Sequence, residues 1–249
     1  MATTEHEAHA FTREQRVYFW LASVNVTALL LANIVGVKLF RFELDMGSFV
    51  VPVEHTVGML PFPITFLLTD LVNEYYGRRA ARRIAYVAFT MAALAWLLLW
   101  AARAMPILEG IPGTATQAAF ENVFGAASLM YLASIAAFLV GNLIDIFLFG
   151  WFKRATGGRM VWLRATGSTV VSQLFDSLLV TMLFFQVLQR AVGQECPDLG
   201  WTLRTAFTGY VLKFAIALAL TPAVYLGRWL LRAAFGLAPL PADETQRGN

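Results

Sequence analysis

The chain has 249 residues, of which 58% are hydrophobic and only 14% are charged, and its formal net charge is +3. A soluble globular domain carries about 25% charged residues, so this composition argues against a soluble protein and favours one that lies mostly in lipid. The single cysteine, Cys196, excludes an intramolecular disulfide. The length suffices for one membrane domain of about six helices, without a soluble domain.

The apolar segments of the chain, taken in order, predict six membrane-spanning helices, the second of them short. They are 17–39, 64–76, 80–105, 128–152, 167–189 and 203–231. Segment 46–63 is apolar but interrupted by proline and glycine, so we expect an extended or re-entrant segment there. We interpret residues 1–16 as a polar tail and 233–249 as a disordered tail, which makes 17–232 one all-α integral membrane domain.

Basic residues are unevenly distributed among the predicted loops. Loops 77–83 and 153–164 contain four lysine or arginine residues each, whereas 106–127 contains none. Short cytoplasmic loops are enriched in lysine and arginine. A topology of six spans with both termini in the cytoplasm puts the loops rich in lysine and arginine on the cytoplasmic side. We therefore expect a multi-pass protein of the bacterial inner membrane. This topology also accounts for the basic residues, and nucleic-acid binding is therefore not expected.

The fifth predicted span carries a polar face. An ionisable side chain inside a span costs about 2.5–3.5 kcal/mol on insertion scales and usually faces the protein interior. Asp176 lies near the middle of this span, and Ser168 and Ser172 precede it at intervals of four residues, on the same helical face. Gln173 precedes Asp176 by three residues. This face therefore predicts a contact with other polar groups inside the protein.

Two more polar clusters lie on other predicted spans. In the fourth span Asn142 precedes Asp145 by three residues, and in the second span Asp70, Asn73 and Glu74 share one face. Together with the fifth span these clusters predict a polar cavity between helices. Carboxylates there match the adjacent N–H groups of a guanine-like ring, and aromatic side chains such as that of Phe62 would stack on the ring.

The acidic residues also admit a purely structural interpretation, in which they form ion pairs within the protein. The candidate pairs are Glu74 or Asp70 with Arg78 or Arg82, Asp145 with Lys153 or Arg154, and Asp176 with Lys213. His55, in segment 46–63, is a candidate proton-coupling group, although a lone histidine in a loop is more often incidental. The sequence alone leaves both interpretations open.

Several other functions are excluded by missing motifs. The three histidines are not spaced as metal ligands, and the chain has no phosphate-binding loop, so no metal and no cofactor are expected. Two aspartates within spans could form an intramembrane protease, but neither Asp145 nor Asp176 lies in the Gly-x-Gly-Asp motif of such proteases. We therefore do not expect an enzyme, and active transport would need an ion gradient or another subunit.

Three stretches resemble the queuosine precursor transporter family, also called the vitamin uptake transporter family. They are 63–77, 141–145 and 162–176, and Asn33 and Lys38 in the first predicted span also fit. The resemblance covers roughly residues 17–232. It implies uptake of 7-cyano-7-deazaguanine or its 7-aminomethyl relative, the precursors used for queuosine modification of tRNA. It also implies a six-helix fold similar to the substrate-binding subunits of energy-coupling-factor transporters.

The resemblance implies roles for individual residues by their position in these stretches. Recognition of the ring is assigned to Asp70, Asp145 and Asp176. Supporting hydrogen bonds are assigned to Asn142, Gln173 and Ser168. From their residue types and places in the chain we add Asn73, Phe62 and Asn33 as further substrate contacts, and Glu74, His55 and Lys213 as candidates for gating or coupling.

The resemblance leaves the energy source open. The main interpretation is a stand-alone permease whose partners are the deazaguanine substrate and membrane lipid. The alternative is a substrate-capturing subunit of an ATP-driven importer, which would form a stable complex with soluble ATPases. Gly141 and Gly150 on the fourth predicted span would allow close helix contacts, within one chain or in a homo-oligomer.

Overall fold

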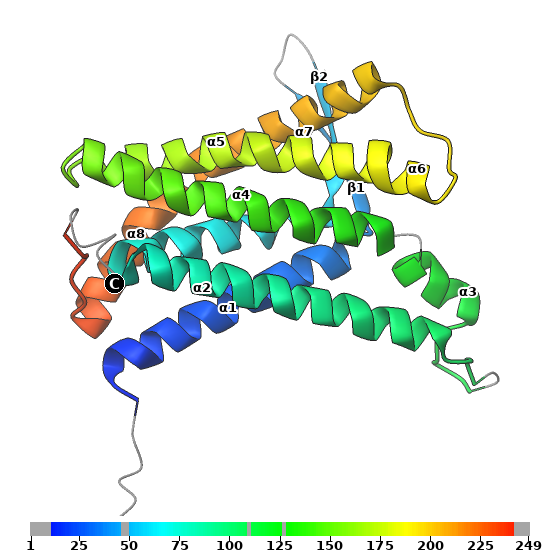
Figure 1. Cartoon of the computed structure of the whole chain (residues 1–249), viewed down its shortest axis with the longest axis horizontal. Coiled ribbons are helices and arrows are strands. Elements are labelled where there is room, and N and C mark those ends of the chain that lie inside the picture. Colours follow the sequence, from blue (N-terminus) through cyan, green and yellow to red (C-terminus); the bar gives the residue numbers. More distant parts are fainter. Residues whose placement is uncertain (1–10, 46–49, 109–110, 126–127, 242–249) are drawn as a thin grey trace, which may run out of the picture.

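A computed structural model describes residues 11–45, 50–108, 111–125 and 128–241, without the side chains of 42–45 and 50–54. The described part is mostly helical, as predicted (Figure 1). The long helices are α1 (Arg13–Val35), α2 (Phe62–Ala104), α4 (Ser128–Ala155), α5 (Val161–Met182), α7 (Leu199–Ala219) and α8 (Thr221–Phe235). The remaining elements are strands β1 (Leu39–Asp45) and β2 (Val50–Thr56), short helices α3 (Gln117–Phe120) and α6 (Gln189–Ala191), a 3-10 turn at Val57–Met59, and π-helical segments at Glu121–Gly125 and Leu183–Leu188.

Helix α2 is broken at one residue. Gly77 has φ 81° and ψ 172°, which is not a helical conformation, and only glycine adopts this region without steric cost. The break separates a limb of residues 62–76 from a limb of residues 78–104, which Figure 1 shows running in different directions. These limbs correspond to the second and third predicted spans.

Four helical segments are long and apolar enough to cross a membrane, and there are five if α7 and α8 count as one span. One of the four runs through the break at Gly77. Helices α7 and α8 meet at an angle of 41°, where Pro222 lacks the N–H that a continuous helix would need. The sixth predicted span, 203–231, is therefore a bent pair rather than one straight helix. The number of six spans stays a prediction.

The segment between α1 and α2 forms an antiparallel hairpin. Leu39 pairs with Thr56 and Asp45 pairs with Val50, while residues 46–49 lie outside the described residues. Helix α1 thus ends at Val35, and the predicted first span ran a few residues too far. Extended backbone was expected only for 46–63, but the first strand of the hairpin is formed by residues 39–45.

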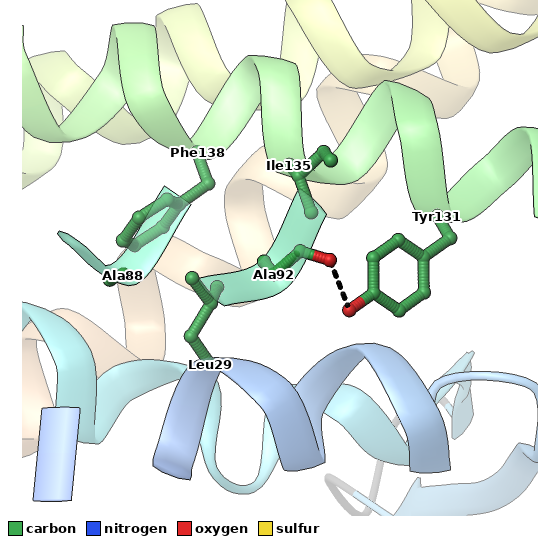
Figure 2. Close-up of a cluster of buried hydrophobic side chains, with 6 residues drawn as sticks. All are labelled: Leu29, Ala88, Ala92, Tyr131, Ile135 and Phe138. Atoms are coloured by element: carbon green, nitrogen blue, oxygen red, sulfur yellow. Dashed lines mark hydrogen bonds between the residues drawn. The ribbon is translucent and has the colours of Figure 1, made fainter. Parts of the chain in front are cut away.

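The helices pack around an apolar cluster shared by α1, α2 and α4. Small residues on α2 allow the other two helices to approach closely, and Tyr131 of α4 donates a hydrogen bond of 3.1 Å to the carbonyl oxygen of Ala92 (Figure 2). The other buried members of this cluster are Leu29, Ala88, Ile135 and Phe138. Large apolar side chains such as Trp20 and Leu98 are about two-thirds exposed, as a lipid-facing surface requires.

The structure describes part of each predicted tail, residues 11–16 and residues 233–241. Helix α1 begins at Arg13, inside the predicted polar tail, with Thr12 as its N-cap. Helix α8 ends at Phe235, and the backbone N–H of Leu240 donates a hydrogen bond of 3.0 Å to the carbonyl oxygen of Glu74. Residues 233–241 therefore have ordered contacts, whereas 1–10 and 242–249 lie outside the described residues.

Candidate functional site

A cavity of about 530 Å³, counting the space at its open mouth, lies between the first limb of α2 and helices α5, α7 and α8. Most of its lining is apolar. Its polar and aromatic lining residues include Phe62, Phe66, Asp70, Thr169, Gln173 and Lys213.

Two polar side chains of this cavity are buried without a full set of hydrogen bonds. Asp70 and Gln173 are each 3% exposed. Oδ1 of Asp70 and Nε2 of Gln173 have no hydrogen-bond partner in the described part of the chain. A buried polar group without a partner costs about 1–3 kcal/mol. An acceptor and a donor on the wall of one cavity therefore fit a ligand that supplies both missing partners.

Aromatic rings form the end of the cavity where α2 begins. Phe62 and Phe66 lie edge to face with their ring centres 5.2 Å apart. Phe62 also contacts Phe138 of α4, and the ammonium nitrogen of Lys213 lies 5.2 Å from the centre of the Phe62 ring. This arrangement provides flat apolar surface next to the polar groups of Asp70 and Gln173, as an aromatic heterocycle requires.

Asp176 does not line the cavity but is ion-paired with Lys213. The pair joins α5 to α7, and both side chains are largely buried. Gly141 of α4 makes room for this arrangement, because a Cβ atom at its position would lie 3.1 Å from Cβ of Asp176. The structure therefore gives Asp176 the internal partner that the sequence left as an alternative, and it places Lys213 in the cavity wall.

Asp145 lies behind the cavity, between α4, α5 and α2. Its Oδ1 accepts hydrogen bonds from the hydroxyls of Ser172 (3.1 Å) and Thr169 (3.3 Å). Its carboxyl group is also close enough to that of Asp70 to form a hydrogen bond. Neither Lys153 nor Arg154 forms an ion pair with Asp145 in the described structure.

Of the predicted supporting residues, Asn73, Ser168 and Asn142 are buried near these groups without lining the cavity, whereas Phe62 and Gln173 line it. Asn73 donates to the carbonyl oxygen of Ile146 over 3.1 Å, which ties α2 to α4. Ser168 donates to the carbonyl oxygen of Ala165. Asn142 is fully buried, and neither atom of its amide group has a partner in the described residues.

Glu74 is the centre of a buried ion cluster. Its carboxylate lies 2.5 Å from Arg164, 3.1 Å from Lys153 and 3.5 Å from Arg228, and it links α2 to α5, α4 and α8. These partners are not Arg78 or Arg82, the ones considered from sequence. Arg164 was counted as a loop residue, but it lies in α5 and is 1% exposed. Its position inside the stretch 162–176 was the signal available in the sequence.

Two predicted residues lie elsewhere. Asn33 lines a second, smaller cavity with Trp96 and Tyr131, and its amide donates to the carbonyl oxygen of Leu29 over 2.9 Å. His55 lies in β2, before the membrane-spanning segment that begins at Val57. Burial, and secondly the charge of Lys213, lower the pKa of His55 to about 4, so its imidazole is neutral near pH 7.

The family described as "Putative vitamin uptake transporter" matches residues 56–227. The chain belongs to this family. The match confirms the resemblance noted in the sequence and includes every residue that lines the first cavity. This vitamin uptake transporter family member is therefore a multi-pass membrane transporter and not an enzyme.

Curated relatives of this family member carry consistent names. A "Probable queuosine precursor transporter" of Bacillus subtilis (strain 168) is 29% identical over 71% of this chain and 72% of its own length. The "Queuosine precursor transporter" of Escherichia coli (strain K12) is 26% identical over 67% of this chain and 68% of its own. A "Probable queuosine precursor transporter" of Haemophilus influenzae is 23% identical over 86% of both chains. No solved structure matches the chain significantly.

Proposed function

We propose that this protein imports a queuosine precursor, 7-cyano-7-deazaguanine or 7-aminomethyl-7-deazaguanine, across the bacterial inner membrane. The observation that carries the proposal is the pair of unpartnered buried atoms, Oδ1 of Asp70 and Nε2 of Gln173, on residues that line one cavity. The names of the curated relatives point to the same class of substrate. The imported base would serve queuosine modification of tRNA.

The chemistry of a deazaguanine fits these side chains. Its guanine-like edge presents N–H donors beside a carbonyl acceptor. A carboxyl oxygen of Asp70 would accept from an N–H group, and the amide N–H of Gln173 would donate to the carbonyl oxygen. Phe62 and Phe66 would pack against the ring. Asp145 and Asp176 would act from outside the cavity, Asp145 through Asp70 and Asp176 through Lys213.

The proposal includes a topology that the fold permits. The two limbs of α2 act as separate spans, the bent pair α7–α8 acts as one, and with α1, α4 and α5 this makes six. Both termini then lie in the cytoplasm, next to the basic loops. Such an arrangement is the one expected for a fold similar to energy-coupling-factor substrate-binding subunits, here acting as a stand-alone permease.

Ligand binding to the purified protein tests this function. A ligand that binds the folded state raises its apparent stability, so we expect 7-cyano-7-deazaguanine to raise the melting temperature in detergent, whereas biotin does not. Replacing Gln173 with leucine keeps the approximate size and removes the donor, and we expect affinity to fall about 10-fold, as for one hydrogen bond of about 1.5 kcal/mol.

The matched control is Glu121→Gln, in the half-buried ion pair with Arg103, away from the first cavity. This variant should bind the deazaguanine as the unmodified protein does. Stabilisation by biotin instead of the deazaguanine, or an unchanged affinity of Gln173→Leu, would contradict the proposed substrate or the proposed site, respectively.

A further inference from the structure

The described helices bury four acidic side chains, at positions 70, 74, 145 and 176, and these fall into two classes. Glu74 faces three cations and Asp176 faces Lys213. Asp70 and Asp145 have no lysine, arginine or histidine within ion-pair distance among the described residues. These two aspartates have each other instead, because their carboxyl groups are within hydrogen-bonding reach. The contact joins α2 to α4 directly behind the substrate cavity.

This contact requires a proton. Oδ1 of Asp70 and Oδ2 of Asp145 receive no hydrogen bond from any N–H or O–H donor in the described part of the chain. A carboxylate can only accept hydrogen bonds, so two ionised carboxylates cannot bond to each other. Like charges at such close range in a buried site also cannot both persist. One proton between the two groups relieves this repulsion and leaves the pair with a single negative charge, and the oxygens of Asp70 keep lone pairs that can still accept from the substrate.

The surrounding groups keep that proton near Asp70. From α5, the hydroxyls of Thr169 and Ser172 donate to Oδ1 of Asp145 and so stabilise the charged form of that carboxylate. Arg164 of α5 also acts electrostatically on Asp70, and its Nε atom is buried without a partner. Asp70 is therefore the member that carries the proton, with Arg164 nearby as a counter-charge once the proton has left.

The other charged groups facing the pair come from α2, α7, α4 and α8. Glu74 of α2 adds negative charge near Asp70. Lys213 of α7 shares the cavity with Asp70, but it is neutralised by Asp176. Lys153 of α4 and Arg228 of α8 are directed at Glu74. Among the described residues, the aspartate pair is thus the acidic group at the cavity wall that has no cation at ion-pair distance.

We propose that the Asp70–Asp145 pair binds one transported proton, and that this proton enters together with the substrate. This inference rests on the proposed function. The pair takes up a proton from the outer side, the substrate binds against the protonated Asp70, and both leave to the cytoplasm. The only bond that forms and breaks is the O–H bond of the protonated carboxyl group. The net result is that one proton and one substrate molecule move inward. The pair returns ionised, with Asp70 turned toward Arg164.

The geometry couples the two ligands because Asp70 belongs to both sites. It lines the substrate cavity and also contacts Asp145, which does not line it. Loss of the proton places two negative charges side by side, and their repulsion disfavours the arrangement in which Asp70 faces both Asp145 and the substrate. His55 is unsuited to this role because its pKa of about 4 leaves it neutral between pH 5 and 8.

Transport by purified protein in proteoliposomes tests the coupling. Counterflow, in which unlabelled 7-cyano-7-deazaguanine inside exchanges with labelled compound outside, needs no gradient and measures transport itself. With an inside-alkaline gradient of one pH unit, we expect labelled compound to accumulate up to about 10-fold, the limit for one proton per substrate. The variant Asp145→Asn keeps the shape of the side chain and should lose the pH-driven accumulation, and counterflow by the same variant distinguishes lost coupling from lost transport. Glu121→Gln should retain both.

The outcomes separate the two proposals. Counterflow without pH-driven accumulation, accumulation driven by a sodium gradient instead, or full accumulation by Asp145→Asn would overturn the proton site while leaving the transporter intact. Absence of counterflow in the unmodified protein would overturn both. A second measurement does not depend on any variant: a pH-sensitive dye inside the vesicles should report one proton entering per substrate, and a lumen that stays at constant pH during uptake would also overturn the proposal.

Discussion

Lys213 of α7 is ion-paired with Asp176 of α5, and the same ammonium group lies 5.2 Å from the centre of the Phe62 ring. One cation thus connects three helices, α2, α5 and α7, at the wall of the substrate cavity. Because the pair is largely buried, its two charges depend on each other for compensation rather than on water.

Removing the cation should therefore be costly. We expect Lys213→Met to lower the free energy of unfolding by about 3–5 kcal/mol, because it leaves Asp176 buried and unpaired. Combining it with Asp176→Asn removes the orphaned charge, so the double variant should be more stable than the single one. Thermal unfolding in detergent measures both, and equal melting temperatures for the single and double variants would contradict the role of the pair.

The ion cluster around Glu74 predicts an order of effects. Arg164 is 1% exposed and 2.5 Å from the carboxylate, whereas Arg228 has a side chain that is 25% exposed and 3.5 Å away. Water compensates an exposed charge better than a buried one. We therefore expect Arg164→Gln to lower the melting temperature much more than Arg228→Gln, and a reversed order would show that the cluster is arranged differently.

Gly77 offers a test of the break in α2. Its φ of 81° and ψ of 172° lie in a region used almost only by glycine, so Gly77→Ala should destabilise the protein by about 1–3 kcal/mol. Gly167→Ala is the control, because it lies inside α5 with ordinary contacts of 3.4 Å or more, and alanine in a helix is favoured by about 1 kcal/mol. A continuous, unbroken helix would instead make both substitutions stabilising.

Asn33 and Phe62 separate the two cavities. Both were predicted from the sequence to contact the substrate, but Asn33 lines the second cavity and Phe62 the first. We expect Asn33→Leu to keep the affinity for 7-cyano-7-deazaguanine and Phe62→Leu to weaken it several-fold through lost stacking, worth about 1 kcal/mol. Isothermal titration calorimetry measures the affinity of both variants. A larger loss of affinity in Asn33→Leu than in Phe62→Leu would place the substrate site at the second cavity instead of the first.

Several features of this protein were readable from the amino-acid sequence. Long apolar segments predicted membrane helices because a span must bury its own backbone hydrogen bonds. The stretches 63–77, 141–145 and 162–176 indicated the family, and the proline- and glycine-rich character of 46–63 indicated extended backbone. Polar residues inside spans identified Asp70, Asp145 and Asp176 as interior groups, since charges avoid lipid.

Only the tertiary structure decided which of these groups meet. Glu74 and Arg164 are 90 residues apart, and Asp176 and Lys213 are 37 apart, so no helical periodicity connects them. Their pairing depends on which helices pack together and how each is rotated about its axis, and close packing at Gly141 contributes to that. The same packing pairs Asp176 with Lys213 and brings the carboxyl groups of Asp70 and Asp145 together without a cation at ion-pair distance among the described residues. It also places Asn33 in the second cavity.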